Sequence, residues 1–164
     1  MKEINVNIGW IEYGPGEDAG SKRTELIEAA IKATAKAYAP YSGFRVGAAI
    51  RLENGQIISG SNFENAAFPS GVCAERNVIA AASSAMPGIK PEAIAIAAAG
   101  QDGLTRDPIP PCGNCRQVIA EEEYRHGRKI EIILYGKSKT IIIQGIENLL
   151  PLQFNTESLK TDCP

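Results

Sequence analysis

The sequence predicts an α/β fold with three α/β/α layers, in which helices cover a mixed sheet of roughly five strands. Two observations lead to this fold class. Segments with the alternation of strands are interspersed with segments of helical spacing along the 164 residues. A nearly all-apolar run at 93–99 indicates a buried central strand. A chain of this length is expected to form one domain with a substantial core.

The chain begins with a predicted strand and a predicted helix. Residues 4–13 alternate apolar and polar side chains as a strand does, and Gly14-Pro15-Gly16 then breaks the pattern. Residues 21–38 carry an apolar stripe at helical spacing, and Pro40 ends it.

A hairpin and a second helix follow. Asn54-Gly55 is a strong hairpin signal and predicts that strands at 44–52 and 56–60 pair. Apolar residues at helical spacing predict a helix at 73–84, which Pro87-Gly88 ends.

The second half repeats this alternation after the central strand. The sequence predicts a helix at 112–124, strands at 130–135 and 140–143 that are antiparallel to each other, and a short helix at 146–149. The predicted helices at 73–84 and 112–124 both begin at a cysteine and follow strands or their loops.

These two helix starts carry the chemistry. They contain Cys73-Ala-Glu75-Arg76 and Pro111-Cys112-Gly-Asn-Cys115. If Cys112 begins a helix, both sulfurs of the second motif lie on one face. Three thiolates leave the fourth zinc position open to water, as in catalytic sites, and zinc deaminases add a glutamate that is not a ligand. The sequence therefore predicts zinc ligands at Cys73, Cys112 and Cys115, with Glu75 as a proton carrier.

Cys-x-x-Cys also occurs in redox pairs and in structural zinc sites. A redox pair is typical of a thioredoxin-like context, which this sequence does not show. A closed structural site needs a fourth ligand, and the only other cysteine is Cys163, in the polar C-terminal tail. We expect the single histidine, His126, to be a surface residue in its charged stretch rather than a ligand or a base.

Composition argues against several classes of partner. A net charge of −2 without a Lys/Arg cluster is not typical of a nucleic-acid binder. No apolar run approaches a membrane span, and no charged-then-apolar leader begins the chain. Because three of the 4 cysteines are needed as reduced ligands, we expect the protein to be cytoplasmic.

Five blocks of sequence together resemble the small, homotetrameric, zinc-dependent cytidine deaminases of nucleoside salvage. In order they are PYSGFRVGAA at 40–49, NFENAA at 62–67, CAER at 73–76, PCGNCRQ at 111–117 and LLPLQF at 149–154. The resemblance implies a cytidine deaminase-like catalytic domain at 21–164 and a homotetramer with active sites at subunit interfaces. Residues 1–20 remain an N-terminal extension without an assigned role.

The resemblance also implies a role for each matching residue. Glu75 moves protons from water to N3 of cytosine and then to the departing amine. Asn62 and Glu64 bind the ribose hydroxyls, and Phe44 stacks on the pyrimidine. The other implied substrate contacts, from backbone groups or from a neighbouring subunit, are Ala66, Ala74, Pro110 and Phe154.

Arginines near the ligands are expected to offset the charge of three thiolates. Arg76 lies one helical turn after the first ligand and can hydrogen-bond to sulfur, and Arg116 can assist it. Three positions depart from the family pattern. Phe68 replaces a common tyrosine, and Asn77 and Asn114 replace residues that are usually small, apolar or hydroxylated, which leaves the preference among modified cytosine nucleosides open.

The expected reaction is zinc-dependent hydrolysis of cytidine and deoxycytidine to uridine and deoxyuridine, with release of ammonia. A deaminase of a related compound such as blasticidin is an alternative, but it would not need the diol-binding pair Asn62 and Glu64. A non-catalytic zinc-stabilised binding module would have no use for Glu75. Nucleic-acid editing is disfavoured by the absence of a basic channel.

Overall fold

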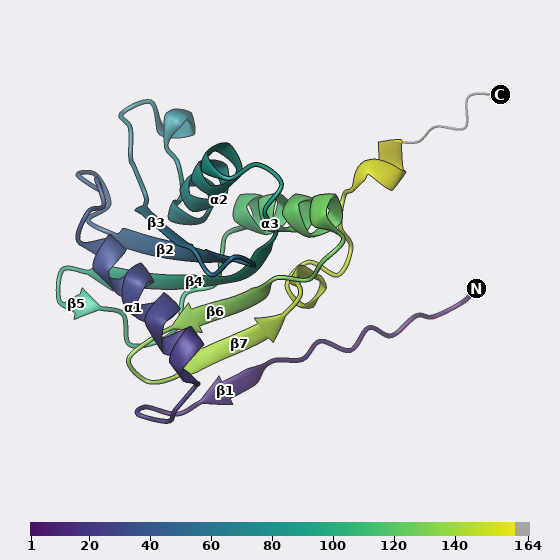
Figure 1. Cartoon of the computed structure of the whole chain (residues 1–164), viewed down its shortest axis with the longest axis horizontal. Helices are drawn as coiled ribbons and strands as arrows, with labels where there is room; N and C mark the ends of the chain where they lie inside the picture. Colours follow the sequence, from purple (N-terminus) through teal and green to yellow (C-terminus); the bar gives the residue numbers. More distant parts are fainter. Residues whose placement is uncertain (160–164) are drawn as a thin grey trace.

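The computed structural model describes residues 1–159 and shows one mixed sheet between two layers of helices (Figure 1). The strand order is β1-β7-β6-β4-β2-β3, and β5 pairs with the end of β4. Among the strands of residues 1–159, only β4 and β6 are parallel neighbours. The strands are β1 (Ile11–Tyr13), β2 (Arg45–Leu52), β3 (Ile57–Ser61), β4 (Pro91–Gly100), β5 (Gly103–Leu104), β6 (Glu131–Tyr135) and β7 (Thr140–Gln144). The helices are α1 (Ser21–Thr34), α2 (Ala74–Ala85) and α3 (Gly113–His126), with short 3₁₀ turns at Phe68–Ser70, Ile146–Asn148 and Thr156–Leu159.

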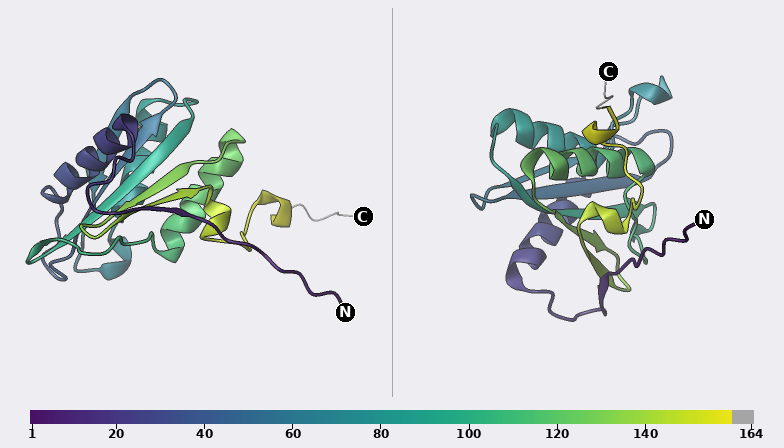
Figure 2. Two further views of the ribbon diagram at one scale, coloured as in Figure 1. Left: turned by 90° about the horizontal axis from the view of Figure 1, so that it is seen from below. Right: turned by 90° about the vertical axis from the view of Figure 1, so that its right-hand side faces the viewer.

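The predicted three-layer arrangement is confirmed. Helix α1 covers one face of the sheet, and α2 and α3 lie together on the opposite face (Figure 2). Each face has its own apolar core: Leu26 and Ile133 lie in the core under α1, and Ile96 and Ile119 in the core under α2 and α3. Helix α1 approaches β2 so closely that a Cβ at Gly47 would lie 2.1 Å from the carbonyl oxygen of Ala30.

The sheet has seven strands rather than the five expected. Five of them are at least five residues long, and the two additions, β1 and β5, are three and two residues long. The predicted strand at 4–13 is wrong for residues 4–10. The backbone N–H of Gly9 donates to Asn148 Oδ1 instead of to a strand, and β7 ends at Gln144, so the residues before Gly9 have no strand partner.

Helix α1 ends four residues earlier than predicted, at Thr34. The Thr34 hydroxyl donates to the carbonyl of Ile31, and a turn follows. Tyr38 then forms a parallel bridge with Phe63, which draws the chain away from the helix axis. The other predicted elements agree with the structure to within two residues at each end, although the last is a 3₁₀ turn. No helix within residues 1–159 is long and apolar enough to cross a membrane.

Candidate active site

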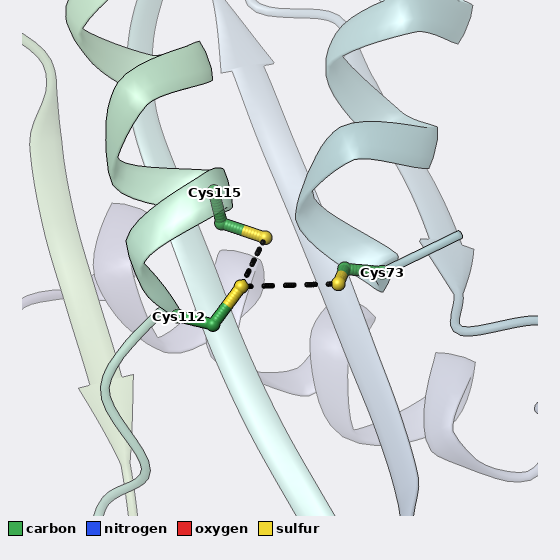
Figure 3. A group of neighbouring side chains, drawn as sticks. All are labelled: Cys73, Cys112 and Cys115. Atoms are coloured by element: carbon green, nitrogen blue, oxygen red, sulfur yellow. Dashed lines mark hydrogen bonds between the residues drawn. The ribbon is translucent and has the colours of Figure 1, made fainter. Parts of the chain in front are cut away.

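Three cysteine sulfurs meet where two helices begin (Figure 3). Cys73 directly precedes α2, Cys112 directly precedes α3, and Cys115 lies in the first turn of α3. The Cys112 sulfur is 3.5 Å from that of Cys115 and 4.0 Å from that of Cys73. Ligand sulfurs in a tetrahedral zinc site with Zn–S bonds of about 2.3 Å are about 3.8 Å apart. The cluster therefore matches three corners of a zinc site.

Burial and the backbone N–H groups at the start of α3 give these thiols different acidities. Burial raises the pKa of Cys112, but the nearby backbone N–H of Cys115, the neighbouring thiols and the N–H of Asn114 outweigh it, and the net pKa is lowered. Burial raises the pKa of Cys73 and of Cys115. Because zinc binds thiolates, a bound cation would favour deprotonation of these two thiols.

Glu75 lies beside the cluster without belonging to it. It occupies the first turn of α2 and is only 5% exposed. Burial raises the pKa of its carboxyl, against smaller opposing effects of its own backbone N–H and of the Cys115 thiol. Within residues 1–159, the one group of three or more side chains placed to hold a metal is the three cysteines. Glu75 is thus suited to hold and move a proton rather than to bind metal.

A short strip of chain carries the predicted sugar-binding residues. Phe63 pairs with Tyr38 on one side and with Val72 on the other, and its ring stacks on that of Tyr38 with centroids 5.1 Å apart. Because successive side chains of an extended segment alternate, Asn62 and Glu64 project to the same side of this strip.

A cavity of about 520 Å³ connects this strip with the cysteine cluster. Its volume lies in the range of small-molecule sites. Asn62, Glu64 and Cys73 are the predicted site residues that line it, and no lining residue is basic. The full lining is Tyr41, Ser42, Asn62, Phe63, Glu64, Asn65, Phe68, Gly71, Val72 and Cys73.

Asn62 also fixes the start of β2. Its Oδ1 accepts from the backbone N–H of Val46 at 2.7 Å, and its Nδ2 donates to the carbonyl of Phe44 at 3.0 Å. The side chain that is predicted to bind sugar therefore positions the backbone of the aromatic that is predicted to stack on the base.

Five other predicted contacts lie outside the cavity lining, namely Phe44, Ala66, Ala74, Pro110 and Phe154, and the side chain of Phe44 is exposed. Ala74 is fully buried in the first turn of α2, and Pro110 is exposed just before the second cysteine motif. Ala66 and Phe154 are exposed, and the carbonyl of Phe154 accepts from Gln117 Nε2 at 2.7 Å. Their contacts with substrate stay predictions.

The two arginines near the ligands differ in their polar contacts. Among residues 1–159, Arg76 has no hydrogen bond or ion pair, so its contact with sulfur stays a prediction. Arg116 donates from Nε to the carbonyl of Pro111 and from Nη1 to that of Leu149, both at 2.9 Å. Its side chain joins the metal-binding loop to the C-terminal segment.

Two further side chains have structural contacts. Asn77 Nδ2 donates to the carbonyl of Ser61 at 3.1 Å and so ties α2 to β3. The expectation that His126 is a surface residue is wrong, since its side chain is only 9% exposed and its Nε2 lies 3.3 Å from Glu122 Oε2. Both groups come from α3, one helical turn apart, and they lie outside the cysteine cluster.

Ser42 is a site residue to which sequence analysis assigned no role. It lines the cavity and donates from Oγ to Glu64. Its Oγ also accepts from the backbone N–H of Phe44, two residues on. Serine often forms this local contact in turns, so a serine two residues before the aromatic that is predicted to stack on the base was the available signal.

Comparisons with known proteins agree with this geometry. Residues 21–126 match the family model described as "Cytidine and deoxycytidylate deaminase zinc-binding region". A cytidine deaminase of Sporosarcina psychrophila is 39% identical over 82% of this chain and 93% of its own length. One of Halalkalibacterium halodurans is 44% identical over 60% of this chain and 70% of its own. The crystal structure of cytidine deaminase from Burkholderia pseudomallei superimposes with a TM-score of 0.68 at 38% identity, covering 80% of this chain and 98% of that one.

A weaker likeness bears on the alternative substrate. Blasticidin-S deaminase of Bacillus cereus is 31% identical over 79% of this chain and 90% of its own length.

Proposed function

The chain belongs to the cytidine and deoxycytidylate deaminase family, and from this premise we propose that it deaminates cytidine and deoxycytidine hydrolytically. Water adds to C4 of the base and the amino group leaves as ammonia, giving uridine or deoxyuridine. The observation that carries the proposal is the buried carboxyl of Glu75 beside three sulfurs at zinc-like spacing. A structural zinc site has no need of such a carboxyl.

The cysteines would hold zinc, the cofactor of the family, through Cys73, Cys112 and Cys115. When bound, zinc supplies the Lewis acidity that makes water a nucleophile near neutral pH. The side chain of Glu75 takes a proton from that water and delivers it to N3 of the base. It then takes the second proton from the oxygen that has added to C4 and gives it to the departing amine, so one carboxyl alternates between base and acid.

The cavity would orient the nucleoside. Asn62 and Glu64 would bind the sugar hydroxyls, Phe44 would stack on the base, and backbone groups of Ala74 and Pro110 would contact the base edge. Hydrogen bonds to the sugar, far from C4, can supply binding energy that lowers the barrier at the reacting carbon.

We also propose a homotetramer with Ala66 and Phe154 completing neighbouring sites. Large apolar side chains near the site lie open to solvent in the single chain: Phe68 is 74%, Leu152 92% and Phe154 59% exposed. Light scattering should give a mass near four times the chain's 17.5 kDa. A mass of only twice the single chain would mean a dimer. Because the ligand thiols must stay reduced, we propose a cytoplasmic location.

The catalytic unit would be residues 21–164, with 1–20 as an extension. The family match begins at the first residue of α1, which supports this boundary.

A substrate panel tests the function directly. Ultraviolet absorbance should report turnover of cytidine and deoxycytidine, with cytosine very poor because it lacks the sugar that Asn62 and Glu64 hold. The 5′-monophosphate should be rejected, because the cavity has no basic side chain to bind the phosphate and is lined by the acidic Glu64. Blasticidin S should be a poor substrate. Faster turnover of cytosine, the monophosphate or blasticidin S than of cytidine would contradict the nucleoside assignment.

A further inference from the structure

Glu64 is held by the turn that precedes β2. Its Oε2 accepts from the backbone N–H groups of Tyr41 at 2.9 Å and Ser42 at 3.3 Å. Its Oε1 accepts from the Ser42 hydroxyl. One turn thus supplies every donor that the carboxylate has among residues 1–159.

The two oxygens of this carboxylate differ in how many further hydrogen bonds they can accept. A carboxylate oxygen accepts about two hydrogen bonds. Both positions on Oε2 are filled by backbone groups, whereas Oε1 has one contact, from Ser42. Because Glu64 lines the cavity, Oε1 is the oxygen with room to accept from a sugar hydroxyl.

The Ser42 hydroxyl links both ends of the nucleoside site. It donates its proton to Glu64 and accepts from the backbone N–H of Phe44 at 2.9 Å. Because Oγ accepts from the N–H of Phe44, its own proton points away from that N–H and is available to the carboxylate. Rotation of Glu64 away from the cavity would break this chain of hydrogen bonds.

We propose that Ser42 is a positioning residue for the sugar: it holds Glu64 Oε1 toward the ribose hydroxyls, and so contributes to selection for nucleosides over free bases. The proposal rests on the proposed nucleoside deaminase function. Electrostatics agree with the geometry, since the Ser42 hydroxyl is the largest cause that lowers the pKa of Glu64, followed by the backbone N–H of Tyr41.

The test compares cytidine with 2′,3′-dideoxycytidine, which lacks both hydroxyls, in the zinc-loaded enzyme. Ser42→Ala should lower kcat/KM for cytidine about tenfold or more, the loss expected for a hydrogen bond to a charged group. It should change kcat/KM for the dideoxynucleoside less than about threefold, and Ser42→Thr, which keeps the hydroxyl, should restore cytidine turnover. Ser84→Ala, an exposed serine in α2, is the matched control. An equal loss on both substrates would overturn the proposal, because Ser42 would then act on the base or on the fold.

A double variant tests whether Ser42 acts through Glu64. Once Glu64→Ala has removed the carboxylate, adding Ser42→Ala should have no further effect on cytidine turnover. Additive losses would overturn the proposal.

A substrate-free measurement separates this proposal from the proposed function. The carboxyl carbon of Glu64, followed by NMR during a pH titration, should show a higher pKa in Ser42→Ala than in the wild type, because a donor to the charged form has been removed. An unchanged pKa would overturn the positioning role even in an enzyme that deaminates cytidine. A raised pKa in a protein that leaves cytidine unchanged would contradict only the proposed function.

Discussion

Proximity in sequence does not decide what a side chain near the metal site does. Arg116 directly follows a cysteine ligand, yet both of its hydrogen-bonded nitrogens face carbonyl oxygens, those of Pro111 and Leu149. It is therefore placed to stiffen the loop before Cys112 and the C-terminal segment. The side-chain amide of Asn62 likewise has a structural role, since it accepts from Val46 and donates to the carbonyl of Phe44 at the start of β2. It therefore shapes the cavity that it also lines.

The metal assignment gives a prediction for single cysteines. Cys112→Ala removes a ligand at the centre of the cluster and should lose zinc and lower the melting temperature, because metal binding is coupled to folding. Cys163→Ala is the matched control and should change neither; Cys163 lies outside the described residues. Metal analysis should find about one zinc per chain in the wild type. Zinc loss from the Cys163 variant would indicate a closed, structural four-cysteine site.

The metal cluster could be predicted at this scale and several contacts could not. Spacing within Cys112–Cys115 and the start of α3 are local properties, so the sequence could predict that these two sulfurs lie together. Cys73 joins them from 39 residues away, and its place in the cluster was predicted from the motif of zinc deaminases. The burial of His126 and the contact of Asn77 with Ser61 depend on how α3 and α2 lie against other parts of the chain. No pattern within either motif encodes that packing.

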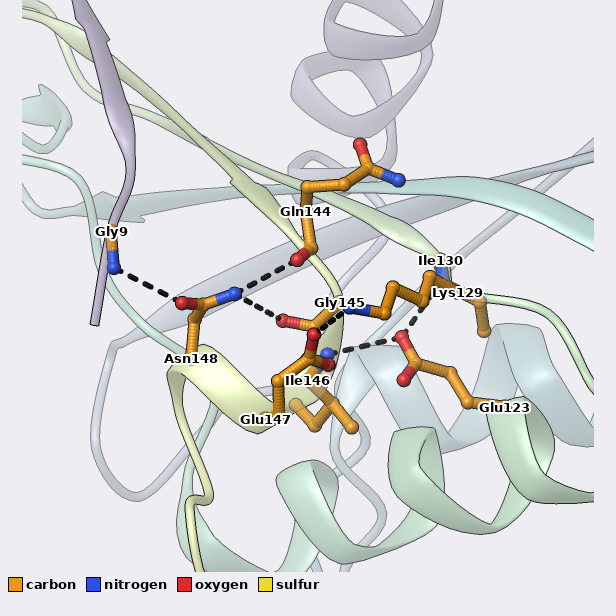
Figure 4. Close-up of polar contacts among 9 residues, drawn as sticks. All are labelled: Gly9, Glu123, Lys129, Ile130, Gln144, Gly145, Ile146, Glu147 and Asn148. Atoms are coloured by element: carbon orange, nitrogen blue, oxygen red, sulfur yellow. Dashed lines mark hydrogen bonds and ion pairs between the residues drawn. The ribbon is translucent and has the colours of Figure 1, made fainter. Parts of the chain in front are cut away.

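Helix α3 is anchored at both ends, at the cysteine cluster and at its last turn. Near the last turn, Glu123 Oε1 accepts from the backbone N–H of Ile130 at 2.8 Å and of Ile146 at 3.1 Å (Figure 4). Gly127 ends the helix with a φ of 60°, a left-handed conformation that glycine adopts without strain. One carboxyl thus joins the end of α3 to the start of β6 and to the turn after β7.

This anchor should make stability depend on pH. Burial is the largest cause that raises the pKa of Glu123 above the ordinary 4.5, against its two backbone donors. The folded state therefore binds the proton more tightly than the unfolded state. The stabilisation of the folded state by this proton is complete below pH 4.5, and it is lost as pH rises through the pKa of Glu123 in the folded state. The stability of the wild type relative to Glu123→Gln should fall as pH rises, measured by thermal unfolding.

Glu121→Gln is the control for this experiment, since Glu121 is exposed on the same helix and makes no hydrogen bond or ion pair among residues 1–159. Its stability difference from the wild type should not follow that pH trend. A difference between wild type and Glu123→Gln that stays constant with pH would contradict the linkage.

Elements whose partners are nearby in sequence were predicted best. The hairpin of β2 and β3 needs only its Asn54-Gly55 turn, and its pairing is confirmed. The strand at 4–13 has the right alternation, but a strand also needs a neighbour, and β7 offers one only to Ile11–Tyr13. The end of α1 is set by the bridge from Tyr38 to Phe63, which connects parts of the chain far apart in sequence.

At the scale of the whole molecule, the site lies on the side of the sheet that α2 and α3 cover, and the N-terminal segment extends outward from β1, which forms the sheet edge opposite β3 (Figures 1 and 2). Ile4, Val6 and Ile8 are 73%, 60% and 48% exposed. Within residues 1–9, the single hydrogen bond to the remainder of residues 1–159 is that of Gly9 with Asn148. The segment contributes no residue to the cavity.

Removing residues 1–9 should therefore preserve the site. The truncated protein should keep its zinc and its kcat/KM for cytidine to within about twofold, because it loses about one weak hydrogen bond. Removing residues 1–13 also deletes β1 and exposes the edge of β7, and should lower the melting temperature by about 3 °C or more. Loss of activity from the shorter deletion would mean that this segment contributes to the site.

The central claim is that Glu75 moves protons beside a zinc ion that it does not bind. The most direct test measures zinc content and cytidine turnover together in Glu75→Gln, which keeps the size of the side chain and removes its proton chemistry. We expect about one zinc per chain, as in the wild type, and a kcat lower by roughly 10²–10⁴. Near-normal turnover with zinc retained would contradict the account, as would loss of the metal, because Glu75 would then be a ligand.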